Sequence, residues 1–517
     1  MLMPSRLTAL SFAVAAAVAP AANSQNVTDP TAAPGMGTAL TIYSTAQPGA
    51  IPPELYRGGG NRGASVPGYG VVRAERELAL IRGRNTVRFT EVAAFIDPTT
   101  VQFESLTDPA GTGVLEQNFQ FDLVSQQKLL ERYIDKKVSV DQIRGNQTET
   151  FSGTLLSMAG GMVLKREDGT LQLLPHNAGV RLPDLPGGLI TKPTLVWDIN
   201  AARAGTHRTR VSYQTNGLTW WSDYNLTYSE GKTANQCKLD VGAWVSILNQ
   251  SGASYPEAKL KLVAGDVQRV APVGRVRRDA AYPAAEAALQ SKSVGFQEKE
   301  FFEYHLYTLG RPTTLPDNST KQIELFPVAR NVPCEKTLVY YGLAPGSFGF
   351  FPKPMTDRTH GTATNKKVDV YLGFKNGQEQ NLGVPLPAGR VRVSKRDDAD
   401  GTLEFIGEDT IDHTARNENV RIKLGSAFDV VGERKQLDFK VDPTRKTMTE
   451  EIEVRLRNQK KEAVTVQVKE NLYRWVNWEI AARTHSFTKE DARTIVFPVK
   501  IAAGSEAVVR YTVQYSW

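Results

Sequence analysis

The sequence predicts a mainly β protein: several antiparallel β-sandwich domains of the immunoglobulin-like kind, or small barrels, with few short helices. From Val71 onward, short β-rich runs are bounded by Gly, Asp or Pro. The final third alternates apolar and polar residues with a period of two, which is typical of half-buried antiparallel strands. The best helical spacing is confined to residues 125–135, with Ser125 as a candidate N-cap.

The composition is that of a globular protein. The chain has 517 residues, which at about 150 residues per domain predicts two to four domains. Hydrophobic residues are 41% and charged residues 23%, which excludes a disordered chain. The net charge of +7 is mild, and the one tight basic run, at Arg275, Arg277 and Arg278, lies in a Pro- and Ala-rich stretch. We therefore expect no nucleic-acid partner.

The N-terminus has the layout of a secretory signal. Arg6 precedes a mostly apolar run over residues 7–18, and Ala22-Asn23-Ser24 is a small-residue cleavage site. We expect residues 1–24 to be a cleavable signal peptide and the protein to reach the periplasm or the cell surface. No later segment is long and apolar enough to predict a transmembrane helix.

Pro- and Gly-rich stretches divide the rest of the chain. Residues 25–70 are predicted to be a linker, 71–190 an N-terminal β-rich domain, 191–365 a central β domain with a mobile insertion at 266–298, and 366–517 a C-terminal β-sandwich. The expected strands of the first block are 78–81, 85–89, 100–104, 151–156, 162–165 and 171–174. Those of the second are 208–213, 224–228, 239–248, 258–263, 301–309, 321–326 and 337–341. Those of the third begin near Val368, Ile452, Val464 and Val509.

A weak repeat recurs where strands end. Asn249, Asn376 and Asn458 each close a β-rich run and precede a polar or Gly-containing turn. Asn and Gly tolerate the left-handed backbone that tight turns require, so we interpret these positions as turn residues. Such spacing is common in immunoglobulin-like sandwiches and indicates architecture rather than chemistry.

The chain has two cysteines, Cys237 and Cys334, each just before a strand-like run. In an exported protein an even pair suggests a disulfide. Two separately buried thiols are an equal alternative, because the sequence does not supply the Cα separation that a bridge requires.

Several segments resemble the mucoidy-inhibitor-like family of exported bacterial proteins, which are built on a domain of unknown function. The similar segments are Tyr213 with 217–224, 244–252, 258–263, 302–309, 321–326, 386–391, 407–409 and His413-Thr414. The similarity extends from about Val71 to Trp517. It implies a β-rich fold and export and leaves the activity open. Many relatives contain a long coiled coil, whereas this chain shows no sustained heptads.

The common catalytic motifs are missing from the sequence. It contains no H-E-x-x-H, no G-x-S-x-G and no P-loop, so we expect no cofactor. The best acidic cluster contains Glu408, Asp409, Asp412 and His413, whose carboxylates and imidazole are weak candidates for a divalent-ion site. The favoured alternative is structural: a strand end whose acids pair with nearby arginines such as Arg390, Arg392 or Arg421.

Two groups of aromatic residues are candidates for ligand contact. The first group comprises Trp220, Trp221, Tyr224 and Trp244. These side chains would form either a platform for sugars or part of a sandwich core, and we favour the core. A loop-like stretch rich in Gly and Pro contains Phe348, Phe350 and Phe351. These side chains are predicted either to contact a partner or a membrane, or to pack back against their own domain.

These observations favour an exported, non-catalytic envelope protein with a binding or structural role. An envelope protein or a glycan is the expected kind of partner, and the ligand and the oligomeric state stay open. The first alternative is an envelope hydrolase that uses the acidic cluster. The second is an outer-membrane β-barrel, suggested by the alternation of Val509, Tyr511, Val513, Tyr515 and Trp517 at the end of the chain.

Overall fold

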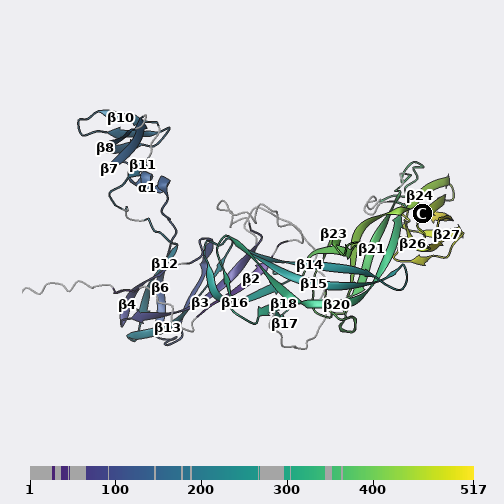
Figure 1. Ribbon diagram of the computed structural model, residues 1–517, viewed down its shortest axis with the longest axis horizontal. Helices are drawn as coiled ribbons and strands as arrows, with labels where there is room; N and C mark the ends of the chain where they lie inside the picture. Colours follow the sequence, from purple (N-terminus) through teal and green to yellow (C-terminus); the bar gives the residue numbers. More distant parts are fainter. Residues whose placement is uncertain are drawn as a thin grey trace, which may run out of the picture. The chain divides into compact units, whose positions relative to one another are not determined.

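The computed structural model is mainly β, as the sequence predicts, with antiparallel and mixed sheets (Figure 1). The structure describes residues 26–28, 37–44, 46, 66–90, 92–144, 147–175, 179–184, 186, 189–265, 267, 296–302, 304–343, 352–362 and 365–517. The predicted signal peptide lies outside these residues, and so does most of the insertion predicted at 266–298.

The chain forms two compact units. The first comprises Met1–Met36, Glu75–Val92 and Gln102–Val211, and the second comprises Gly37–Ala74, Ala93–Val101 and Ser212–Trp517. This grouping differs from the predicted blocks because strand pairing joins distant segments. For example, β12 (Thr194–Ala201) pairs with β4 (Gly83–Thr90) and β6 (Thr112–Gln120) of the first unit. Strands β3 (Gly68–Leu80), β5 (Ile96–Ser105) and β13 (Gly205–Thr215) contribute residues to both units.

The first unit contains a four-stranded sheet, of order β1-β4-β12-β6, and a five-stranded sheet, of order β10-β9-β8-β7-β11. Their remaining strands are β1 (Asn26–Thr28), β7 (Lys137–Arg144), β8 (Gln147–Ser157), β9 (Met162–Lys165), β10 (Leu171–Leu174) and β11 (Gly179–Arg181). The five-stranded sheet buries one face, with Val140, Leu155 and Leu164 fully inaccessible. Its other face is open to solvent, as the alternation of these strands requires.

The predicted helix is confirmed as α1 (Gln126–Arg132). Ser125 is its N-cap, and the Ser125 hydroxyl accepts a hydrogen bond from the Lys128 N–H at 3.2 Å. The helix ends earlier than the periodicity predicts. Asp135 has a φ of 64°, in the left-handed region, so the helical backbone does not extend to it.

The second unit contains a sheet of order β17-β18-β16-β2-β3-β13-β5 and a larger one of order β23-β22-β14-β15-β20-β21-β24-β25-β30-β27. Its strands are β2 (Thr38–Ser44), β14 (Leu218–Glu230), β15 (Gln236–Asn249), β16 (Tyr255–Ala264), β17 (Phe296–Phe301), β18 (Tyr304–Leu309), β19 (Thr313–Leu315), β20 (Ser319–Tyr341), β21 (Lys367–Lys375), β22 (Gly389–Arg396), β23 (Leu403–Ile411), β24 (Asn419–Asp442), β25 (Thr447–Asn458), β26 (Val464–Asn471), β27 (Trp478–Arg483), β28 (Thr488–Lys489), β29 (Thr494–Ile501) and β30 (Ser505–Ser516). A short 3-10 helix, η3 (Gln378–Gln380), follows β21.

Three strand expectations differ from the structure. The run predicted at 301–309 is a hairpin of β17 and β18, because Phe302 adopts a φ of 60° between them. The runs predicted at 321–326 and 337–341 belong to one long strand, β20. Inside the predicted linker, β2 is a strand whose residues Leu40 and Ile42 are fully buried.

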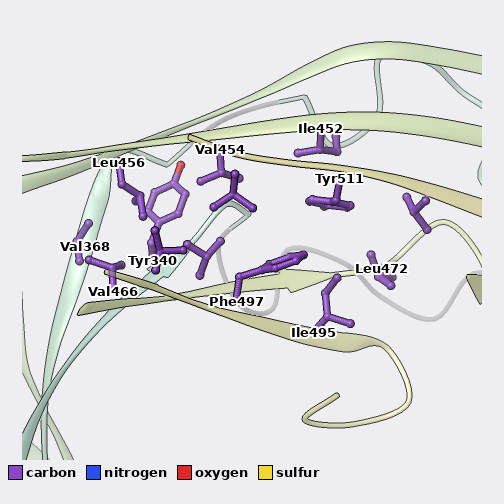
Figure 2. Packing of buried hydrophobic residues seen from close by; sticks show 14 of the residues in the cluster. Tyr340, Val368, Ile452, Val454, Leu456, Val466, Leu472, Ile495, Phe497 and Tyr511 are labelled. Carbon is purple, nitrogen blue, oxygen red and sulfur yellow. The ribbon is translucent and has the colours of Figure 1, made fainter. Parts of the chain in front are cut away.

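The C-terminal core lies between two layers of strands (Figure 2). One layer contains β24, β25 and β30, which supply residues such as Val454 and Tyr511. The other contains β26 and β29, which supply Val466 and Phe497. The alternation predicted at the end of the chain is confirmed, because the four side chains at 509, 511, 513 and 515 are each at most 2% exposed.

The strand-end asparagines have a different role from the predicted one. Asn249, Asn376 and Asn458 are buried, and none of them adopts a positive φ. Instead, each side-chain amide hydrogen-bonds to the backbone of the loop that follows. Asn458 Nδ2 donates to the carbonyl of Glu462, four residues later, and to that of Ala502, while Asn458 Oδ1 accepts the Lys460 N–H.

The bonds of Asn249 repeat this geometry. Its Nδ2 donates to the carbonyl of Ala253, again four residues later, and to that of Pro316, while its Oδ1 accepts the Ser251 N–H. The left-handed residue of this turn is Gly252, whose φ is +77°. The repeat read from the sequence is therefore a repeated side-chain bracket that joins a strand end to its loop.

We expect Asn458→Ala to destabilise the C-terminal layers by about 1–3 kcal/mol, because buried carbonyls and an N–H lose their partner. Hydrogen exchange of the β25 and β26 amides measures this local free energy. Asn477→Ala, at an exposed position that has no positive φ, is the control and should change it little. Equal protection in the two variants would contradict the bracket.

Candidate functional site

The acidic cluster that the sequence offers as a weak metal candidate is dispersed. Glu408 lies 3.6 Å from the Arg392 guanidinium, and Asp409 accepts hydrogen bonds from two backbone N–H groups. His413 Nδ1 accepts a backbone N–H at 3.1 Å, whereas Asp412 is exposed. Within the described ranges, no group of three or more His, Cys, Asp or Glu is arranged to hold a metal ion.

The other sequence candidates have separate outcomes. Phe348, Phe350 and Phe351 lie outside the described residues. The two cysteines lie directly opposite each other on β15 and β20, with Cα atoms 4.8 Å apart, and form the disulfide Cys237–Cys334. Of the two alternatives that the sequence leaves open, the structure has the bridge.

The four aromatic residues divide into two groups. Trp220, Trp221 and Tyr224 are buried, as the core interpretation predicts. The Tyr224 hydroxyl donates to the Pro387 carbonyl at 2.7 Å, which satisfies its polar end inside the core. Trp244, in the middle of β15, is 41% exposed. The core interpretation that the sequence favours for all four residues is therefore wrong for Trp244.

Trp244 belongs to a polar sheet face that we call the Asp223 face. Strand register places its members on the same side of neighbouring strands, because directly paired residues of a sheet share a face. The members are Trp221, Asp223 and Asn225 of β14, Gly242, Trp244 and Ser246 of β15, Gln322 and Glu324 of β20, Arg390 and Arg392 of β22, and Glu408 of β23.

Asp223 is the organising residue of this face. Its side chain is 9% exposed and accepts hydrogen bonds from Trp221 Nε1 at 2.8 Å and from the Ser246 hydroxyl at 3.2 Å. The other carboxylate oxygen lies 3.3 Å from Arg392 Nη1 and 3.7 Å from Arg390 Nε. A carboxylate with this many donors is held in one orientation, which fixes the guanidinium groups around it.

Positive and negative groups are balanced on the Asp223 face. The two arginines are offset by Asp223, by Glu408 and by Glu324, which is paired directly with Trp244. Gly242 adds no side chain next to Trp244 on the same strand. The face therefore presents the indole ring of Trp244 beside a glycine that leaves space next to it. The surrounding side chains donate and accept hydrogen bonds, and their charges nearly cancel.

One serine–histidine pair has the contacts of a catalytic dyad but not the access. Ser105 Oγ lies 3.1 Å from His207 Nδ1, and His207 Nε2 lies 3.2 Å from the Arg203 carbonyl. The carbonyl fixes the tautomer in which Nδ1 accepts the serine proton. Ser105 and His207 are 1% and 2% exposed, so a substrate does not reach them. The pair holds β5, β13 and the loop after β5 together.

The C-terminal core contains two buried ion pairs, which we call the Arg474 clamp. Arg474 Nη2 lies 3.0 Å from Glu450 Oε1, and Arg434 Nε lies 2.9 Å from Glu470 Oε2. All four side chains are at most 2% exposed. Burial raises the pKa of Tyr511 well above its ordinary value, so its hydroxyl keeps its proton and donates to Glu470 Oε2 at 2.6 Å.

The clamp also holds the segment before β21. Arg474 Nη1 donates to the carbonyls of Met355 and Asp357, and Arg474 Nη2 donates to that of His360. Arg434 Nη1 donates to the Gly361 carbonyl. The guanidinium groups thus satisfy backbone carbonyls that lie against a buried core, which is an anchoring role and not a catalytic one.

Comparison with known proteins leaves the family open. No family model, no curated protein and no solved structure matches the chain.

Sequence reasoning did not identify the organising residues of either group. Asp223 stands in an aromatic-rich run, Trp220-Trp221-Ser222-Asp223-Tyr224, and a carboxylate in such a run is itself a signal of a paired buried charge. The clamp residues Glu450 and Glu470 lie one step beyond the apolar alternations that contain Ile452 and Val468, on the same faces of their strands.

Proposed function

We propose that this chain is an exported, non-catalytic binding protein of the bacterial envelope that holds a neutral saccharide on the Asp223 face. The observation that carries the proposal is Trp244, a large aromatic side chain left 41% exposed beside the fixed Asp223 network. An indole ring packs well against the C–H face of a pyranose. The surrounding carboxylate, amide and guanidinium groups match the hydroxyls at the edge of such a ring.

The charge of the face favours a neutral ligand. Asp223 offsets Arg392 at 3.3 Å, and Glu408 lies 3.6 Å from the same guanidinium. A strongly acidic ligand would have to compete with carboxylates already in place. A polyhydroxylated ligand needs only to share the accessible donors and acceptors, among them the exposed side chains of Gln322 and Glu324.

Export is part of the proposal. The N-terminal sequence has the layout of a secretory signal, and the Cys237–Cys334 bridge suits an oxidising compartment. The described residues contain no helix that is both long enough and apolar enough to cross a membrane. The resemblance to the mucoidy-inhibitor-like family supports the same location, and we propose an immunoglobulin-like sandwich for the C-terminal layers.

An array of neutral and acidic oligosaccharides tests the function. We expect the purified chain to bind neutral members, and Trp244→Ala to weaken that binding about tenfold or more, because the stacking surface is lost. Phe428→Ala is the matched control: Phe428 is 95% exposed, in the same unit and outside the Asp223 face. It should leave binding within about twofold.

Two results would contradict the proposal. The first is an array on which no neutral oligosaccharide binds above background. The second is equal binding by the Trp244 and Phe428 variants, which would place the ligand elsewhere. The hydrolase alternative predicts cleavage of a bound oligosaccharide, which chromatography of the recovered ligand would detect.

A further inference from the structure

The five-stranded sheet of the first unit has a cleft on its solvent face. The cleft has a volume of about 650 Å³, which is within the range of small-molecule sites. It is lined by the ends of β7, β8, β9 and β11 and by the segments beside them. Gly153 is required beneath it, because a Cβ there would come within 2.7 Å of the Lys165 carbonyl oxygen at the end of the neighbouring strand β9.

Strand register arranges the cleft residues in two rows. In one row Thr154 of β8 lies between Lys165 of β9 and Lys137 of β7. In the next row Ser139 of β7 lies between Ser152 of β8 and Arg181 of β11. Three hydroxyls are thus flanked by three cations, and Arg166 adds a fourth cation to the lining.

The hydroxyls and two of the cations are available to a ligand. Ser139 Oγ and Ser152 Oγ share one hydrogen bond at 2.9 Å, so one of the two hydroxyl protons stays available. Lys137 is paired with Glu167 at 2.8 Å, and Arg181 is paired with Asp141. Lys165 and Arg166 are exposed and form no ion pair within the described residues.

We propose that this cleft binds the oxyanion groups of an acidic saccharide. Unpaired cations beside hydroxyl donors match a sulfate, phosphate or carboxylate substituent. Two carboxylates, Asp135 and Glu167, also line the cleft, and the four cations outnumber them. The remaining lining includes Leu156, Leu182 and Pro183, which offer apolar surface to a sugar ring. The volume leaves room for more than an isolated ion. This is a second site, on a different unit from the Asp223 face, and it does not depend on the function proposed above.

Binding of a sulfated dextran tetrasaccharide, compared with the unsulfated tetrasaccharide, tests the proposal by titration calorimetry. We expect the sulfated form to bind and the unsulfated form to bind at least tenfold more weakly. Added salt should weaken the sulfated complex, because it screens the cations. Lys165→Gln with Arg166→Gln should weaken it at least tenfold.

Two further variants separate the cleft from general attraction to a basic protein. Lys440→Gln with Arg445→Gln removes the same charge from exposed positions of the second unit and should change binding less than twofold. Ser152→Ala with Thr154→Val changes no charge and should weaken binding severalfold. Trp244→Ala should leave binding of the sulfated tetrasaccharide unchanged. The cleft and the Asp223 face are therefore tested independently, and either proposal can fail without the other.

Three outcomes would overturn the proposal. They are no binding of the sulfated form, equal binding of the two tetrasaccharides, and an equal loss in the cleft and control charge variants. If the Lys165 and Arg166 variant loses its structure by circular dichroism, the uncharged Ser152 and Thr154 variant decides the question, because unchanged binding there contradicts the cleft.

Discussion

Replacing Arg474 with methionine is expected to lower the free energy of unfolding of the C-terminal layers by about 3–5 kcal/mol. The substitution roughly keeps the volume but leaves Glu450 as a buried carboxylate without its partner at 3.0 Å. It also removes the donors for the carbonyls of Met355, Asp357 and His360. A buried charge that loses its partner is among the most destabilising single changes known in proteins.

Hydrogen exchange of the β25, β26 and β30 amides in the full chain measures this loss, because it reports local free energies without assuming a single unfolding transition. Arg445→Met is the matched control. Arg445 lies between β24 and β25, is 84% exposed and lies 3.8 Å from Asp442, which is itself 43% exposed. An exposed pair of this kind is worth about 0–1 kcal/mol, so protection should change little. Equal losses in the two variants would contradict the clamp.

A double variant separates the unpaired charge from the other contacts. Arg474→Met with Glu450→Met removes both charges, and we expect it to recover part of the stability lost in Arg474→Met alone. Recovery should be incomplete because the three carbonyls still lack their donors. A double variant that is no more stable than the single one would show that the carbonyl contacts, and not the ion pair, account for the effect.

The clamp also shows how far the sequence predicts this fold. The alternation of Ile452, Val454 and Leu456 correctly predicts which face of β25 is buried. Glu450 is on the same face, two residues earlier, yet a charged side chain ends an apolar pattern when the pattern is read by hydrophobicity alone. Its burial depends on Arg474, which follows β26 and is distant in sequence, and no local pattern records such a partner.

The Asp223 face could not be predicted from the sequence for a related reason. The sequence places Trp244 in a nearly continuous β-rich run, which is typical of a strand covered on both faces. The exposure of Trp244 is set by its neighbours on other strands, Asp223 and Glu324, and strand order is a property of the whole sheet. Short elements with local signals, such as the helix capped by Ser125, are predicted well because their determinants lie within a few residues.

Breaking the Cys237–Cys334 disulfide is the second large effect that we expect. The bridge joins residues 97 apart in sequence, across paired strands at the centre of the larger sheet. A crosslink that closes a loop of about 100 residues removes conformational freedom from the unfolded chain, worth about 4.7 kcal/mol in the chain-entropy model. Observed losses are usually about 2–5 kcal/mol, and we expect Cys334→Ser to fall in that range.

The chain has two cysteines, so any cysteine variant opens the same disulfide. Cys237→Ser, Cys334→Ser and the double variant should lose nearly equal stability, because any of them opens the same loop. Dithiothreitol should lower the stability of the wild type to the level of the variants and leave the double variant unchanged. Denaturant unfolding, together with hydrogen exchange of the β15 and β20 amides, measures the stability of each variant.

Alkylation of two free thiols in the exported, non-reduced wild type would contradict the bridge. A double variant as stable as the wild type would show that the paired strands and their core hold this region together without it.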